Sequence, residues 1–284
     1  MKTTVLTCID GSSYAPAVCD AAAWAALRLA APLKFLHVLH KEQGVPSADL
    51  SGSIGLGARE SLLEELASLD EKRGKLSQER GRQLLAAAKL RARDAGVAES
   101  EGLQRHGGLV ETLTELQAGI RLLVLGKRGE AADVAADHMG SHLERVIRAM
   151  QRPILVTTAS FAPPQRVMIA FDGSATIRKG VEMVAGSPLF QGLPCHLVLV
   201  GADTAETRAQ LAHAKQTLEK SGFTAPAVIL PGETETVLSR YQQEQGIELM
   251  IMGAYGHSRI RQLLIGSTTT QMLRKTTIPL LLLR

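Results

Sequence analysis

The strongest constraint on this 284-residue chain is that its sequence repeats itself. The opening stretch TTVLTCIDGSS has a counterpart in QRVMIAFDGSA, and both are apolar runs that end in Asp-Gly-Ser. Three further apolar runs of the first half recur in the same order in the second half: 33–40 with 195–202, 120–129 with 247–256, and 152–158 with 278–284. Such internal similarity indicates two copies of one structural unit.

The apolar runs alternate with stretches of helical character, at 14–31, 82–95, 109–118, 175–186, 204–221 and 233–245. Short continuous apolar runs are typical of parallel strands that are buried on both faces and joined by right-handed helical crossovers. We therefore predict an α/β fold of two tandem doubly wound, Rossmann-like domains, each with a five-stranded parallel sheet. The predicted domains are 1–158 and 165–284, joined by the Pro-containing linker ASFAPP.

The last apolar run of each half, ILVTT and IPLLLL, carries almost no polar residue. An uncovered sheet edge of this kind pairs with other strands. We expect the two halves to pack as an intramolecular pseudo-dimer through these final strands, with a homodimer between chains as the alternative.

The first half carries an insert at about residues 41–80. The Asp-Gly-Ser motifs are 172 − 10 = 162 residues apart, but the later glycines are 253 − 126 = 127 apart, so about 35 residues are extra. The insert begins with the loose stretch 44–57 and continues as a charged helical segment at 61–80, in which Leu62, Leu66, Leu69 and Leu76 have near-helical spacing. One side of such a helix can pack; we interpret the segment as a solvated amphipathic helix, with a lid or a partner-docking helix as the alternatives.

The composition excludes several functions. The formal charge of +4 comes from 32 basic and 28 acidic residues without a basic block, and aromatic residues make up 3%, so nucleic-acid binding is not expected. Three cysteines without metal-ligand spacing indicate buried thiols in a reducing compartment. His138 and His142 lie four residues apart but lack further ligands. With neither a signal peptide nor a membrane span evident, we predict a cytoplasmic protein without a metal site.

A glycine-rich loop near the end of the chain has the chemistry of a phosphate site. Gly253 ends an apolar run, Gly256 follows it, and Gly266 precedes Ser267, Thr268 and Thr269 at the start of a predicted helix. Glycines allow a ligand to approach the backbone closely, and a helix N-terminus offers N–H groups to an anion. The hydroxyls add donors, and His257, Arg259 and Arg261 add positive charge. The loop therefore predicts a triphosphate site.

Other nucleotide-binding patterns do not fit. No Lys precedes Ser267, as a Walker A loop requires, and no GxGxxG follows the first strand of either half. Ala254 stands where an HxGH signature needs its first His.

The spacing G-x2-G-x9-G-[ST], met by Gly253, Gly256, Gly266 and Ser267, resembles that of the ATP-binding members of the universal stress protein (UspA) family. The resemblance covers essentially the whole chain as a tandem pair. It implies that the adenine and ribose lie against Ala170, Phe171, Asp172, Val198, Val200 and Met252. It also implies that the phosphates lie in a loop formed by Gly253, Tyr255, Gly256, His257, Gly266, Ser267 and Thr268. Tyr255 departs from the family pattern, which often has His there.

The first half departs further from this pattern. Gly126 and Gly129 keep the first gap, but Gly140 comes one residue late. The loop between them carries Glu130, Asp133 and Asp137, which repel a triphosphate and are only partly offset by Lys127 and Arg128. We expect ATP, accompanied by Mg²⁺, to bind in the second half alone.

The sequence contains no recognisable catalytic constellation, and Asp172 is the one carboxylate expected in the pocket. We therefore expect a stress-response nucleotide-binding module with regulatory function and no catalytic residues. Two alternatives are a slow ATPase and a structural, partner-binding stress protein that acts through the insert of the first half.

Overall fold

A computed structural model describes residues 3–39, 56–130, 141–254 and 266–284 of the chain. The strands of the first half are β1 (Thr4–Cys8), β2 (Leu33–Leu39), β3 (Ser100–His106), β4 (Ile120–Gly126) and β5 (Ile154–Thr157). Those of the second half are β6 (Val167–Ala170), β7 (Cys195–Val200), β8 (Ala227–Leu230), β9 (Leu249–Gly253) and β10 (Leu280–Leu283).

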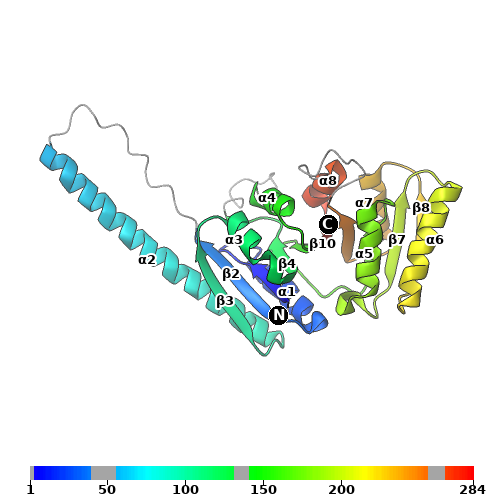
Figure 1. The fold of residues 1–284 in the computed structure, drawn as a ribbon, viewed down its shortest axis with the longest axis horizontal. Coiled ribbons are helices and arrows are strands. Elements are labelled where there is room, and N and C mark those ends of the chain that lie inside the picture. The colour runs from blue at the N-terminus through cyan, green and yellow to red at the C-terminus, as the bar shows by residue number, and fades with distance from the viewer. Residues whose placement is uncertain (1–2, 40–55, 131–140, 255–265) are drawn as a thin grey trace.

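All ten strands form one sheet, in the order β3-β2-β1-β4-β5-β10-β9-β6-β7-β8. The strands are parallel within each half. At the centre of the sheet β5 pairs antiparallel with β10, with Leu155 opposite Leu281 (Figure 1). The fold class predicted from the repeat is confirmed, and the two apolar final strands pair as their sequences predict.

The helices cover the sheet on both faces. They are α1 (Ala15–Leu29), α2 (Leu56–Asp94), α3 (Leu109–Leu116), α4 (Ser141–Ala149), α5 (Ala175–Ala185), α6 (Ala205–Lys220), α7 (Thr234–Glu244) and α8 (Ser267–Lys275), with short 3-10 turns at Gln117–Gly119 and Pro188–Phe190. One apolar cluster joins one face of the sheet to α1, α2, α5 and α6. The other joins the opposite face to α3, α4, α7 and α8. Each cluster runs through both halves.

The three cysteines are free thiols. Cys19 and Cys195 are buried, and burial raises the pKa of each thiol to about 12. Cys8 is half-buried. No helix within the described residues has the length and apolar character needed to cross a membrane.

The insert of the first half does not form a separate element. The segment predicted at 61–80 and the helix predicted at 82–95 are one continuous helix, α2, of 39 residues. Leu66, Leu69 and Leu76 are exposed, which agrees with the interpretation of this segment as a solvated helix. The reason is length, because α2 extends well past the sheet that it covers (Figure 1).

Aromatic side chains join α1 of the first half to the linker and to the second half. The ring of Trp24 lies 5.6 Å from that of Phe161 in the linker and 6.1 Å from that of Phe190 in the second half, measured between centroids. Arg28, one turn further along α1, donates from Nε to the Leu189 carbonyl at 3.1 Å. The linker is thus fixed at a packed junction.

Two cations cross the junction in opposite directions. Lys127, just after β4, donates to the carbonyls of Arg274 (2.7 Å) and Thr276 (3.0 Å) at the end of α8. Arg284, just after β10, donates to the carbonyls of Arg148 (2.8 Å) and Met150 at the end of α4. Each half therefore supplies the positive charge that a helix C-terminus of the other half attracts.

Replacing Trp24 tests this junction. Trp24→Ala removes the ring shared by the linker and the second half, and we expect the free energy of unfolding to fall by about 2–4 kcal/mol. Leu27→Ala, at a position 51% exposed on the same helix, should change it by less than about 1 kcal/mol. Urea unfolding followed by circular dichroism measures both; equal losses would contradict the junction role of Trp24.

Candidate nucleotide-binding site

Several of the predicted site residues that the structure describes lie at the carboxyl ends of strands around the topological switch point of the second half. Strand β6 lies between β9 and β7. The crossovers α5 and α6 leave on one face and α7 and α8 on the other, so the chain diverges between β6 and β9. Ligands of open parallel sheets bind outside the carboxyl ends of strands at such a point. Asp172 follows β6 there, and Gly253 ends β9.

The turn after β6 presents a carboxylate. Asp172 is exposed, and its Oδ1 accepts a hydrogen bond from the Ser174 amide at 2.9 Å. Gly173 between them has φ +71°, a conformation that favours glycine. Ser174 then caps α5 by accepting from the Ile177 amide at 3.2 Å. The Asp-Gly-Ser motif is therefore a turn and a helix cap in one.

The start of α8 is tied to the end of β9. The Gly266 amide donates to the Ala254 carbonyl at 3.3 Å, and Thr269 Oγ1 donates to the Gly253 carbonyl at 3.0 Å. Thr269 is buried, so this hydroxyl holds the helix against the strand and is not the ligand donor that the sequence predicted. Gly266 has φ −58°, which any residue adopts, so its backbone conformation does not require glycine.

The N-terminus of α8 differs from the other helix N-termini of the second half. The first turn of α5 is capped by Ser174, that of α6 by Thr204 and that of α7 by Glu233. Among the described residues, no side chain caps α8, whose N-cap residue is Gly266. Unpaired N–H groups at a helix start carry partial positive charge and bind anions. The helix that opens beside Asp172 is therefore the one that can receive a phosphate.

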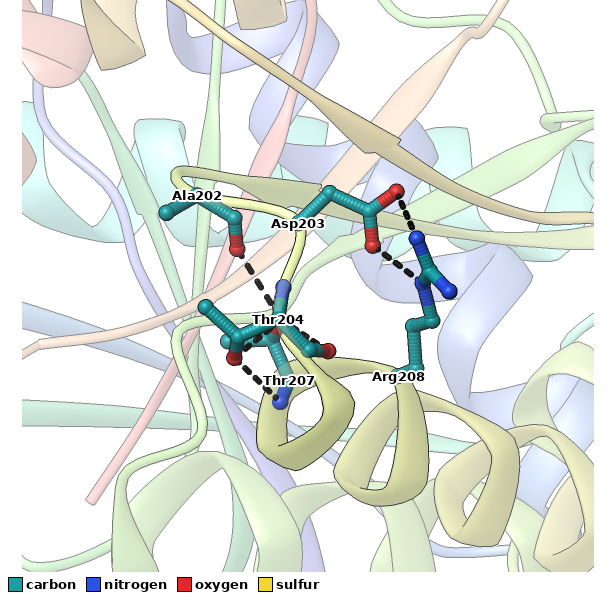
Figure 2. Close-up of polar contacts among 5 residues, drawn as sticks. All are labelled: Ala202, Asp203, Thr204, Thr207 and Arg208. Atoms are coloured by element: carbon teal, nitrogen blue, oxygen red, sulfur yellow. Dashed lines mark hydrogen bonds and ion pairs between the residues drawn. The ribbon is translucent and has the colours of Figure 1, made fainter.

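The start of α6, at the same edge of the sheet, shows the capped alternative (Figure 2). Thr204 Oγ1 accepts from the Thr207 amide at 3.2 Å, and Thr207 Oγ1 accepts from the Thr204 amide at 2.9 Å, which forms a capping box. Arg208 donates to both carboxylate oxygens of Asp203, at 2.6 and 2.9 Å, and these bonds lower the pKa of Asp203. The amides at the start of α6 are therefore already hydrogen-bonded to side chains of the same helix start.

The other end of α8 is held as firmly as its start. Lys275 forms an ion pair with Glu235 of α7, a carboxylate only 7% exposed. Lys127 of the first half donates to the carbonyls of Arg274 and Thr276. The helix is therefore held at both ends by contacts within the chain, and such preorganisation lowers the entropy cost of binding a ligand.

The remaining predicted residues divide into an edge group and a core group. Ala170, Val200, Gly253, Gly266 and Thr268 are half-buried, and Ser267 is exposed, so all six reach the edge of the sheet. Phe171, Val198 and Met252 are no more than 5% exposed and pack in the apolar core. Tyr255, Gly256 and His257, together with Arg259 and Arg261, lie outside the described residues.

The corresponding place in the first half is occupied by its own side chains. Asp10 accepts from the Ser12 amide at 3.0 Å and, through its second oxygen, from the Glu130 amide at 2.9 Å. Arg80 of α2 forms an ion pair with the Glu130 carboxylate. Both groups lie over Gly11, where an added Cβ would meet the Arg80 guanidinium and the Glu130 carboxylate. The counterpart over Gly173 is the neutral Gln210.

This arrangement changes the reason for expecting a poor site in the first half. The sequence suggested repulsion by acidic residues, but the charge of Glu130 is paired with Arg80, and Asp133 and Asp137 lie outside the described residues. Lys127, expected to offset those charges, donates across the junction, and burial together with Arg128 lowers its pKa. The turn after β1 is covered by a charged ion pair and the turn after β6 by the neutral Gln210, and this difference replaces repulsion as the reason to expect a poor site in the first half.

No cluster of three or more His, Cys, Asp or Glu residues that could hold a metal ion occurs within the described ranges. His142 lies half-buried in the first turn of α4, and His138 lies outside those ranges. The sequence predicted that Thr269 contacts the ligand, whereas it anchors α8. It did not identify Arg80 or Gln210, because nothing in the local sequence links Arg80 to Glu130 or Gln210 to Gly173.

The fold and the site define a tandem pair of doubly wound α/β domains, with a helix N-terminus open to an anion in the second. The chain belongs to the universal stress protein family, whose sequence profile matches residues 1–158 and 198–284. Asp172 falls between these two ranges, so its assignment to the site depends on the repeat, the resemblance and the structure.

Three proteins are similar to this chain, one compared by sequence and two by structure. The chain is 41% identical over 284 residues to universal stress protein Slr1230 of Synechocystis sp., covering 99% of each chain. The structure is similar to that of a universal stress protein from Archaeoglobus fulgidus, with a TM-score of 0.73 and 17% identity over 98% of this chain and 97% of that one. A putative universal stress protein from Pseudomonas aeruginosa has a TM-score of 0.59 at 15% identity, over 99% and 93% of the two chains.

A substitution at Thr269 tests how α8 is held. Thr269→Val keeps the side-chain volume but removes the donor to the Gly253 carbonyl, and we expect the free energy of unfolding to fall by about 1–2 kcal/mol. Thr270→Val, in the same turn, makes the same change of residue type and should have a smaller effect. Thermal unfolding of both variants measures the difference, and equal effects would show that the Thr269 hydroxyl does not anchor α8.

Proposed function

We propose that this chain binds ATP in its second half and acts in the cytoplasm as a nucleotide-dependent regulator of the stress response. The observation that carries the proposal is the start of α8. It lacks a side-chain cap among the described residues, it is fixed against β9 by Thr269, and it opens at the switch point beside the exposed Asp172. Family membership and the loop Gly253 to Ser267 support the same assignment.

The proposal is asymmetric. In the first half Arg80 and Glu130 occupy the space over the turn after β1, and Asp10 already accepts two backbone hydrogen bonds. A nucleotide entering there would have to break an ion pair and displace both side chains. One nucleotide per chain is therefore the expected stoichiometry.

ATP with Mg²⁺ fits the chemistry of the second site better than a neutral ligand. The backbone N–H groups of a helix N-terminus are donors, and the adjacent hydroxyls of Ser267 and Thr268 can donate as well, which suits the acceptor oxygens of phosphates. The loop in the sequence adds His257, Arg259 and Arg261. Mg²⁺ would reach this site with the nucleotide, held by the phosphate oxygens.

The direct experiment is to denature freshly purified protein and to identify any released nucleotide by mass and stoichiometry. About one ATP per chain supports the proposal. If no nucleotide is released and added ATP does not bind in calorimetry, the proposal is wrong and the partner-binding alternative is favoured.

The two Asp-Gly-Ser turns supply a matched pair of variants. Asp172→Ala and Asp10→Ala each remove an acceptor for the amide two residues later, and Asp10→Ala also removes the acceptor for the Glu130 amide. We expect Asp172→Ala to weaken ATP binding at least about tenfold, which corresponds to about 1.4 kcal/mol, and Asp10→Ala to leave it unchanged. Isothermal titration calorimetry on both variants measures this. Equal weakening would contradict the asymmetry between the halves.

Bound ATP should turn over far more slowly than the about 1–10³ s⁻¹ of typical enzymes. Phosphoryl transfer needs a metal against the β- and γ-phosphates and a group that orients the attacking water. A P-loop has a Lys that contacts the phosphates, but here Ile265 precedes Gly266 and Ser267 follows it directly. The resemblance places Asp172 at the nucleoside end of the nucleotide, where it cannot orient a water at the γ-phosphate. Multiple-turnover phosphate release in the enzymatic range, lost in Asp172→Ala, would instead establish the ATPase alternative.

A further inference from the structure

The turn after β6 is covered by a side chain from α6, the helix that follows β7. Gln210 lies in the second turn of α6 and is half-buried. A Cβ added at Gly173 would meet the side-chain oxygen Oε1 of Gln210, and Gly173 itself is buried. Neither the glycine motif nor the positions implied by the family resemblance include Gln210.

The first half shows how far a side chain in this place reaches. Arg80 of α2 stands over Gly11 as Gln210 stands over Gly173. Arg80 forms an ion pair with Glu130, which follows β4 and whose amide is hydrogen-bonded to the turn after β1. The Arg80 side chain therefore links α2 to both strand ends that flank the switch point of the first half. By the internal repeat, Gln210 lies at the equivalent place in the second half, beside the ends of β6 and β9.

The orientation of the Gln210 amide is fixed by its neighbour on α6. Gln210 Nε2 donates to Glu206 Oε1 at 3.2 Å. An ionised carboxylate only accepts hydrogen bonds, so the NH₂ group has to face Glu206 and the oxygen faces the turn. Within the part of the chain that the structure describes, no donor reaches this oxygen. Gln210 thus presents an oriented acceptor next to Asp172.

The order of the strands decides which part of a nucleotide meets this acceptor. Along the rim β9 is followed by β6 and then by β7, at about 4.8 Å per strand. Phosphates bound at the start of α8 lie at the β9 end of this row. The base then lies at the β7 end, where the family resemblance also places it, at Val198 and Val200. The sugar joins the two over the turn after β6, which Gln210 Oε1 covers.

Building on the nucleotide binding proposed for this site, we propose that Gln210 Oε1 accepts a hydrogen bond from a sugar hydroxyl of the ligand. The second half then selects ribonucleotides over their deoxy analogues. Arg80 cannot play this part in the first half, because a guanidinium has only donors. The two halves therefore differ in the chemistry offered to the sugar as well as in the side chains that cover the turn.

The turn after β6 has supports that do not involve Gln210. Asp172 Oδ1 accepts from the Ser174 amide at 2.9 Å, and Arg178 of α5 donates from Nη1 to the Gly173 carbonyl at 2.8 Å. A substitution at Gln210 leaves both hydrogen bonds in place. A change in ligand preference on such a substitution therefore reports a contact with the ligand.

Isothermal titration calorimetry of the full chain with ATP, 2′-deoxy-ATP and 3′-deoxy-ATP tests the proposal. We expect the wild type to bind ATP about three- to tenfold more tightly than one of the two analogues, the effect of one neutral hydrogen bond. The weaker analogue identifies the hydroxyl. Gln210→Met keeps the length of the side chain but removes the acceptor, so it should bind ATP and that analogue equally. Gln216→Met, the same change at an exposed position of α6, is the matched control and should keep the wild-type preference.

Three results would overturn the proposal while leaving ATP binding intact. The first is a wild type that binds all three nucleotides equally. The second is an unchanged preference in Gln210→Met, which would assign the hydroxyl to another group, such as Asp172. The third is equal weakening of all three nucleotides in Gln210→Met, which would make Gln210 a support of the site only. A wild type that binds none of the three would instead contradict the proposed function itself, and this proposal with it. Far-ultraviolet circular dichroism checks that both variants remain folded.

Discussion

The antiparallel pairing of β5 with β10 is the contact on which the rest of the structure depends. Both strands are fully buried, and as free edges each would expose a row of unpaired backbone groups next to leucine and valine side chains. Their pairing turns two five-stranded sheets into one of ten strands, and it brings Lys127 and Arg284 to the ends of α8 and α4. The position of α8 in the second half thus depends partly on Lys127, a side chain of the first half.

The second half separates two uses of a helix start. Where a helix only has to begin, Ser174, Thr204 or Glu233 satisfies the first amides, and hydrogen bonds from Thr236 and Glu235 lower the pKa of the Glu233 carboxylate. At the start of α8, where a ligand is expected, the N-cap residue is Gly266. The hydroxyl that stabilises this helix start belongs to Thr269, three residues later, which donates to the Gly253 carbonyl. The run Gly-Ser-Thr-Thr therefore combines an open helix end with an internal anchor.

Much of the fold could be predicted from the sequence because each strand proposed in one half could be compared with its counterpart in the other half. Four strands of each half repeat as apolar runs, and the Asp-Gly-Ser turns mark equivalent positions. The third strands, β3 and β8, were not located, since both lie at the outer edges of the sheet and neither is a buried apolar run. Local sequence identified Asp172 and Gly253, but it could not reveal the ion pair of Arg80 with Glu130, which joins positions 50 residues apart. Nor could helical spacing alone show that the leucines of α2 lie beyond the sheet.

Because the two half-sheets run in opposite directions, the two halves present their strand ends to opposite sides of the molecule. The carboxyl ends of β1 and β4 and those of β6 and β9 open at opposite rims of the ten-stranded sheet, because the strands reverse direction between β5 and β10. Helix α2 follows the carboxyl end of β2, so it leaves from the rim of the first half. A ligand at the carboxyl ends of β6 and β9 would therefore lie at the opposite rim from the one that α2 leaves, so contacts made by α2 and by the ligand would not compete for the same surface.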